Sequence, residues 1–142
     1  MKKYILLISI VLLSGTMLFG YDAAQEEMSV EEAFSRGLSF FEDKTVKRDY
    51  RIAAGYFEIG ADIWDEDSML YLALSLLNIN EDKFLEEAFY WMSLAYYFGA
   101  EHAEFYWDII KFLMTRPRVG SVLKQVDDDL LKEGYKKGAW EF

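Results

Sequence analysis

Cysteine is absent from this 142-residue chain, and proline and histidine each occur once. Without cysteine there are no disulfides, thiol nucleophiles or sulfur ligands for a metal, so packing alone has to stabilise the fold. The single proline favours long helices. His102 has no recognisable nucleophile partner, and the chain contains no HExxH, GxSxG or glycine-rich phosphate motif. We therefore predict that the protein is not an enzyme and binds no cofactor.

Positive charge is also scarce. Lysine and arginine number 15 against 25 aspartates and glutamates, which gives a net charge of −10. Nucleic acid and anionic membrane surfaces repel a chain of this charge, so neither is an expected partner. We expect a protein partner. A basic one would suit the charge, although solubility alone also accounts for many acidic domains.

Two acidic runs, residues 62–67 and 127–129, raise the question of calcium binding. Neither run has the glycine and the distal glutamate of a calcium-binding loop. Acidic side chains at helix starts and on solvated helix faces explain both runs better. We predict no metal site.

Apolar residues, by contrast, are abundant, with 53% hydrophobic and 18% aromatic residues in one domain-sized chain. Nine aromatic residues and His102 fall within residues 86–107. An aromatic ligand box and a packed core both fit this segment. The core is favoured because almost every face of the corresponding helix is apolar. Trp91 is accordingly expected to be a core residue whose removal leaves a large cavity.

Residues 1–20 have the form of a signal peptide. Lys2 and Lys3 precede an apolar run that is short for a membrane span, and small residues follow where a peptidase can cut. Cleavage after Gly20 would remove two lysines and no acids, leaving a charge of −12 on a mature chain that begins with a linker at residues 21–28. The alternative is an uncleaved membrane anchor. We expect a bacterial protein that is periplasmic or secreted.

Helical signals occupy the rest of the chain. Ser29 forms a capping box with Glu32, Asp49 can cap a second helix, and the acids at residues 65–67 suit the start of a third. The remaining helices are expected at residues 83–98, 103–114 and 127–135. Residues 116–118, Arg-Pro-Arg, are expected to be a loop. No alternating strand pattern is present, so we predict an all-α fold.

Residues of similar size recur at an interval of 35, which indicates repeated helix pairs. The matched positions are Ala33, Ser68 and Ala103; Gly37, Leu72 and Trp107; Ala53 and Ala88; Tyr56 and Trp91; Phe57 and Met92; Gly60 and Ala95; Ala61 and Tyr96. A helix pair cannot bury its apolar face alone. Stacking of such pairs therefore predicts one continuous core.

Residues 87–95 (EAFYWMSLA), followed by GAEHA at residues 99–103, resemble the second half of a Sel1-like repeat, a relative of the tetratricopeptide repeat. Residues 46–53 are similar to the family's passage from the inter-helix loop into its second helix. The family's glycine is kept at Gly99 but replaced at Trp64.

The resemblance implies a short right-handed α/α solenoid of two to three helix-pair repeats. It divides the chain into a degenerate first repeat at residues 29–64 and a second repeat at 65–100. A partial third repeat and a C-terminal capping helix would occupy residues 101–142. His102 would lie in a turn, where such repeats often carry histidine.

Members of this family act as adaptors, regulators of envelope complexes or immunity-type proteins that cap a toxin. The resemblance therefore implies an exported, non-catalytic module for protein–protein interaction. Tyr90, Tyr96 and Tyr97 are predicted to reach the surface and contact the partner. The alternative is an enzyme, because cysteine-rich secreted relatives are associated with β-lactam binding or hydrolysis. Turnover of nitrocefin by the purified protein would distinguish the two, although this chain lacks the disulfide pairs of those relatives.

Overall fold

Helices make up all the regular structure of residues 28–140, the part of the chain that the computed structural model describes. The all-α prediction is confirmed for this part. The expected signal peptide, most of the linker and residues 141–142 lie outside it. The described helices are α2 (Val30–Glu42), α3 (Tyr50–Ala61), α4 (Glu66–Ile79), the 3-10 turn η2 (Asp82–Phe84), α5 (Leu85–Phe98), α6 (Ala103–Phe112) and α7 (Arg116–Lys132). Not one of these described helices combines the length and apolarity needed to cross a bilayer.

Side-chain caps begin the first three helices, as the sequence predicts. The Ser29 hydroxyl accepts a hydrogen bond from the Glu32 amide at 3.1 Å, and the Asp49 carboxylate accepts two from the first turn of α3. Asp65 caps α4 in the same way. Each cap satisfies amides that have no partner within their helix. The predicted capping box is only half formed, because the Glu32 carboxylate pairs with Arg36 at 2.7 Å.

Helices α3, α5 and α7 end in the same way, at an interval of 35 residues. A residue with left-handed backbone angles closes each end, and the next amide donates to the carbonyl five residues earlier. The left-handed residues are Trp64 (φ 62°), Gly99 (φ 86°) and Gly134 (φ 85°). The hydrogen bonds run from Asp65 to Gly60 (3.1 Å), from Ala100 to Ala95 (2.9 Å) and from Tyr135 to Leu130 (2.9 Å). Trp64 therefore adopts the conformation that Gly99 adopts, despite its side chain.

Buried positions follow the same interval along the helices. The buried sets are Ala33, Ser68 and Ala103; Gly37, Leu72 and Trp107; Ala53, Ala88 and Leu123; Gly60, Ala95 and Leu130. Space is very tight at Gly60, where an added Cβ would collide with the Ser68 side chain. The small residues in these sets allow neighbouring helices to approach closely.

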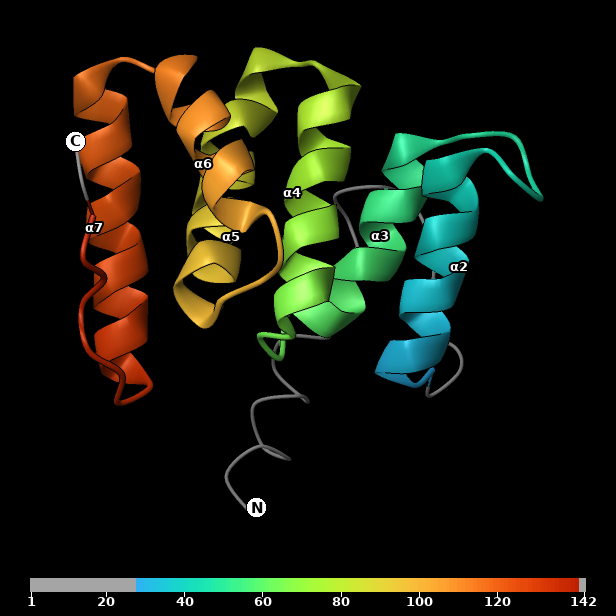
Figure 1. Cartoon of the computed structure of the whole chain (residues 1–142), viewed down its shortest axis with the longest axis horizontal. Helices are drawn as coiled ribbons and strands as arrows, with labels where there is room; N and C mark the ends of the chain where they lie inside the picture. The colour runs from blue at the N-terminus through green and yellow to red at the C-terminus, as the bar shows by residue number, and fades with distance from the viewer. Residues whose placement is uncertain (1–27, 141–142) are drawn as a thin grey trace.

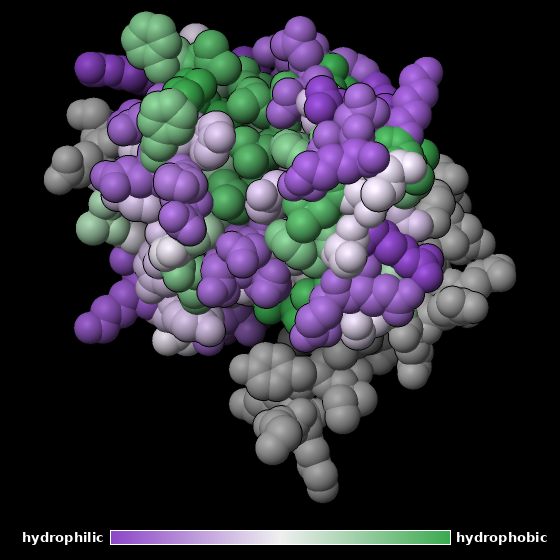
Figure 2. All heavy atoms as spheres, turned by 45° about the vertical axis from the view of Figure 1, so that its right-hand side comes forward, coloured by the Kyte–Doolittle hydropathy of each residue, from purple (hydrophilic) through white to green (hydrophobic). Residues whose placement is uncertain are grey.

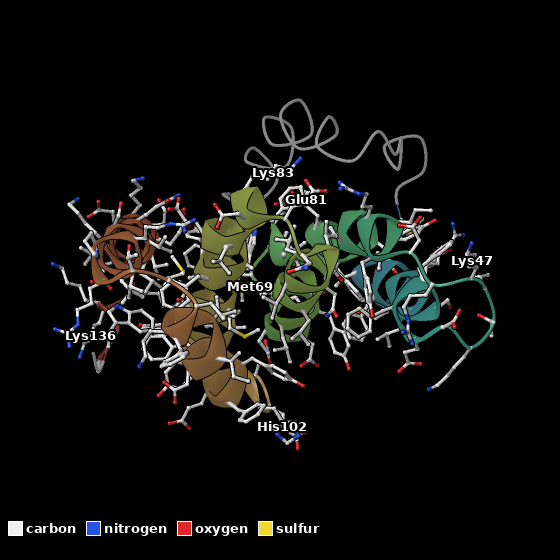
Figure 3. The ribbon with its side chains drawn as sticks, turned by 90° about the horizontal axis from the view of Figure 1, so that it is seen from above. Lys47, Met69, Glu81, Lys83, His102 and Lys136 are labelled. Carbon is white, nitrogen blue, oxygen red and sulfur yellow. The ribbon has the colours of Figure 1, made fainter. Side chains whose placement is uncertain are left out.

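The helices stand side by side in antiparallel order from α2 to α5, and α7 lies on the far side of α5 (Figure 1). Seen from above, α6 projects from one side of this row, with His102 at its outer end (Figure 3). Lys83 and Glu81 lie on the opposite side of the row. The molecule therefore has two broad faces, and only one of them carries α6.

The prediction for the last helix was wrong. Residues 116–118 are not a loop but the first turn of α7, which begins eleven residues before the predicted start at residue 127. Pro117 lies in that first turn, where a helix needs no amide donor from it. Arg118 pairs with Glu86 at 2.8 Å and with Asp82 at 3.4 Å, which fixes the start of α7 against α5 and η2.

The aromatic segment is mostly core, but Trp91 is an exception. Phe89, Met92 and Leu94 are fully buried on α5. Trp91 is only half-buried and packs against the edge of the core, whereas Tyr56, its match one interval earlier, is buried. The prediction that Trp91 is a core residue was therefore wrong, because α7 does not cover this side of α5 fully.

Candidate functional site

Helix α6 is held to the rest of the molecule by one apolar face. The buried residues of this face are Ala103, Trp107, Ile110 and Met114, at helical spacing. The Trp107 indole donates a hydrogen bond to the buried hydroxyl of Ser93 at 2.9 Å and stacks on Phe89 with ring centroids 5.6 Å apart. These contacts fix α6 on α5.

The opposite face of α6 is also apolar, and it is exposed. The exposed fractions are 63% for Phe105, 39% for Ile109, 90% for Phe112 and 56% for Leu113. We call these four residues the α6 face. Their spacing of i, i+4, i+7 and i+8 is that of a stripe that normally packs against another helix. A contiguous exposed apolar stripe of this kind is typical of an interaction surface.

The α6 face is exposed because α6 has few neighbours. Among the described helices its main packing partner is α5, and α7 packs against α5 as well, not closely against α6. The third helix pair therefore does not form a hairpin as tight as α2 with α3 or α4 with α5. Figure 3 shows α6 standing clear of the row.

A hollow lies beside α6 and extends the apolar surface. Figure 2 shows hydrophobic side chains gathered at its upper left and continuing into this hollow. Tyr71 of α4 packs against α2, with ring centroids 5.4 Å from Phe34 and 5.3 Å from Phe41. Burial raises the pKa of the Tyr71 hydroxyl, and Glu42, Asp67 and Tyr106 of α6 raise it further.

Carboxylates border this apolar surface. Asp67 is exposed at the start of α4, but partial desolvation still raises the pKa of its carboxyl. Three neighbouring carboxylates raise the pKa further, and they belong to Asp65, Glu66 and Glu101. Glu101 belongs to the turn that precedes α6, so the acidic ends of α4 and α6 face one another.

The three tyrosines predicted to contact a partner are engaged within the molecule. Tyr90 donates its hydroxyl to Asp129 at 2.9 Å, and Tyr97 donates to the Lys136 carbonyl at 3.0 Å. The Tyr96 ring packs against Trp107, with centroids 5.5 Å apart. All three are half-buried. They hold α6, α7 and the C-terminal segment against α5, so we place the candidate surface elsewhere.

His102 lies in the turn before α6, where it has a left-handed backbone (φ 67°). Its side chain is exposed, and Nε2 lies 3.4 Å from Glu101. The acidic runs have structural roles in residues 28–140: Asp65 caps α4, and Asp127 accepts hydrogen bonds from the Gly138 amide and the Trp140 indole. Within that range no three acids or histidines are grouped to hold a metal ion.

A second hollow, of about 460 Å³, lies between α5 and α7 and is a weaker candidate. Its walls include Tyr90 and Trp91, whose rings meet at 82°. Two of its charged groups are already paired within the molecule, Glu86 with Arg118 and Lys83 with Glu81. Fewer of its side chains are therefore free to contact a partner than on the α6 face.

Sequence reasoning missed the α6 face, although a signal was present. Residues 103–114 contain two apolar stripes at helical spacing, one through Trp107 and one through Phe105 and Phe112. One stripe is enough to attach a helix to a core, so the second required a separate explanation.

Comparison of the chain with models of protein families, with curated proteins and with solved structures gives no match. Residues 28–140 have an all-α fold, in which buried positions recur at a 35-residue interval. No family is established by these comparisons. The likeness to Sel1-like repeats rests on the residues named above.

Proposed function

We propose that this protein is an exported, non-catalytic helical-repeat module that binds another protein. In this proposal the three helix pairs are Sel1-like repeats stacked as a short solenoid, and the α6 face with the adjoining hollow is the docking surface. The partner would be met in the bacterial envelope or outside the cell. Adaptor, regulator of an envelope complex and immunity-type protein are all roles that such a module can fill.

The observation that carries the proposal is the second apolar face of α6. Phe112 and Phe105 are the most exposed large apolar residues of the described chain. They lie on a helix that is anchored firmly by Trp107, so their exposure is not a consequence of a loose attachment. Aromatic residues on a rigid element supply large contact area at a small entropic cost.

The proposal is tested by affinity capture from envelope extracts, with the chain expressed from its full sequence as bait. Phe112→Ser and Leu131→Ser baits form a matched pair, because each removes one exposed apolar side chain, on α6 and on α7 respectively. We expect a protein that is retained by the Leu131→Ser bait and lost from the Phe112→Ser bait. Retention of nothing at any ionic strength, or of the same proteins by both baits, would refute the proposal.

A further inference from the structure

We propose that the partner segment seated on the α6 face is an amphipathic helix carrying lysines or arginines beside its apolar stripe. This inference rests on the proposed function and adds to it the secondary structure and the charge of the partner segment that binds the α6 face. Three features of the surface support it: the shape of the apolar stripe, the charges along its borders, and the charge of the chain as a whole.

The apolar stripe has the dimensions of a helix contact. From Phe105 to Leu113 it covers about 12 Å of helix axis, or slightly more than two turns. Its residues recur at i, i+4, i+7 and i+8, which matches the ridges and grooves of a second helix lying along it. The hollow that Figure 2 shows beside the apolar surface leaves room for such a helix.

The borders of the stripe are acidic. Glu66 and Asp67 lie in the first turn of α4, and the charge of Glu101, in the turn before α6, acts on Asp67. On the other border, Lys111 is bonded to Asp108 at 2.9 Å and lies 4.1 Å from the centre of the Trp107 ring. That cation is engaged by groups of its own helix.

Several of the bordering acids are left without a cation. Within residues 28–140, neither Glu66, Asp67 nor Glu104 has an ion-pair partner. A partner with basic residues at the edges of its apolar stripe would supply the missing counter-charges. An acidic partner would meet several carboxylates at once.

The charge of the chain disfavours a second copy as the occupant. Each copy carries a net charge of −10. A symmetric contact through the α6 face would bring two chains of the same negative charge together. Like charges placed across an interface cost free energy and suppress the pairing. A basic helix from another protein has no such penalty.

The test is a binding titration of the full-length protein with a labelled model peptide, followed by fluorescence anisotropy. The peptide contains only leucine and lysine, with the leucines at helical spacing. Two further peptides serve as controls: one of the same composition in scrambled order, and one in which glutamate replaces every lysine. The scrambled peptide reports attraction that depends on charge alone.

We expect the helical Leu/Lys peptide to bind at least about tenfold more tightly than either control peptide. Raising the salt concentration should weaken it, because the borders contribute charge. Phe112→Ser should weaken it by about tenfold as well, whereas Leu131→Ser should leave the affinity unchanged. Equal binding of the helical and scrambled peptides, or no effect of Phe112→Ser, would overturn the inference.

Failure of the inference can be distinguished from failure of the proposed function. If the extract yields a protein whose capture depends on Phe112 while the Leu/Lys peptide does not bind, the function stands and the basic helix is wrong. Concentration-dependent dimerisation that Phe112→Ser abolishes would assign the face to a second copy and overturn the inference. Binding of anionic lipid vesicles through Phe112 would overturn it also.

Discussion

Helices α5 and α6 are neighbours in the sequence and similar in composition, yet their environments differ. Helix α5 is covered by α4, α6 and α7, so Phe89, Met92 and Leu94 are fully buried. Helix α6 is covered mainly by α5, and three of its seven apolar residues face solvent. The difference shows that aromatic content alone does not define a core. The number of helices packed around a helix determines whether its apolar residues are buried or exposed.

The largest expected effect contrasts a phenylalanine from each helix. Phe89→Ala should lower the free energy of unfolding by about 3–5 kcal/mol, because it leaves a cavity beneath Trp107. Phe112→Ala should change it by no more than about 0.5 kcal/mol, since the ring is already exposed. Urea unfolding of both variants measures the difference. Similar losses for both would mean that the α6 face is covered within the isolated protein.

The attachment of α6 to α5 is tested at a single hydrogen bond. Ser93→Ala removes the acceptor of the buried Trp107 indole, which should cost about 1–3 kcal/mol because the N–H is left without a partner. Ser35→Ala, on the exposed side of α2, is the matched control. Hydrogen exchange should show faster opening of α6 than of α4 in Ser93→Ala. Uniform loss of protection across both helices would indicate that α6 is not a separate unit.

Trp91 of α5 is expected to contribute less to stability than Phe89 of the same helix. Because the indole is half-buried, Trp91→Ala should lower the free energy of unfolding by about 1–2 kcal/mol, less than a full core truncation. Chemical denaturation alongside Phe89→Ala provides the measurement. If Trp91→Ala lowers the free energy of unfolding as much as Phe89→Ala does, Trp91 is a core residue, as the sequence predicted.

A smaller effect depends on pH. Burial, followed by the charges of Asp62 and Glu87, raises the pKa of Glu58 to about 7. Between the ordinary pKa of 4.5 and this value the folded state holds a proton that the unfolded state releases. Stability should therefore fall as the pH rises through this window.

Glu58→Gln should flatten that dependence, and Glu104→Gln, on the exposed side of α6, should leave it unchanged. Thermal melts from pH 4 to about pH 8 across the pKa window give the comparison. A Glu58→Gln curve parallel to that of the unaltered protein would show that Glu58 is solvated in the folded state.

Local signals in the sequence predicted much of the fold. Ser29 and Asp49 cap the helices that they were expected to cap, and Gly99 ends α5. These features depend only on a few adjacent residues, so they can be recognised without the tertiary structure. The start of α7 was missed because the prediction placed Pro117 in a loop, whereas proline is tolerated in the first turn of a helix.

The candidate site was harder to predict, because exposure depends on packing between distant residues. Tyrosine is common in protein interfaces, which is why the sequence pointed to Tyr90, Tyr96 and Tyr97. In the structure these side chains instead make contacts within the protein, with Asp129, Trp107 and Lys136 respectively. The third copy of the helix-end motif, at Gly134, was available in the sequence as a glycine 35 residues after Gly99. Its recognition would have extended α7 and identified α6 as the first helix of a pair.

The α6 face is exposed in the isolated protein, and we propose that a partner protein covers it. Because the chain has no cysteine, Leu113→Cys and Leu131→Cys each introduce a single thiol whose alkylation rate can be measured. We predict rapid alkylation of both in the purified protein, and protection of Leu113→Cys alone when envelope extract is added. Protection of Leu113→Cys before any extract is added, or equal rates for both thiols afterwards, would contradict the account.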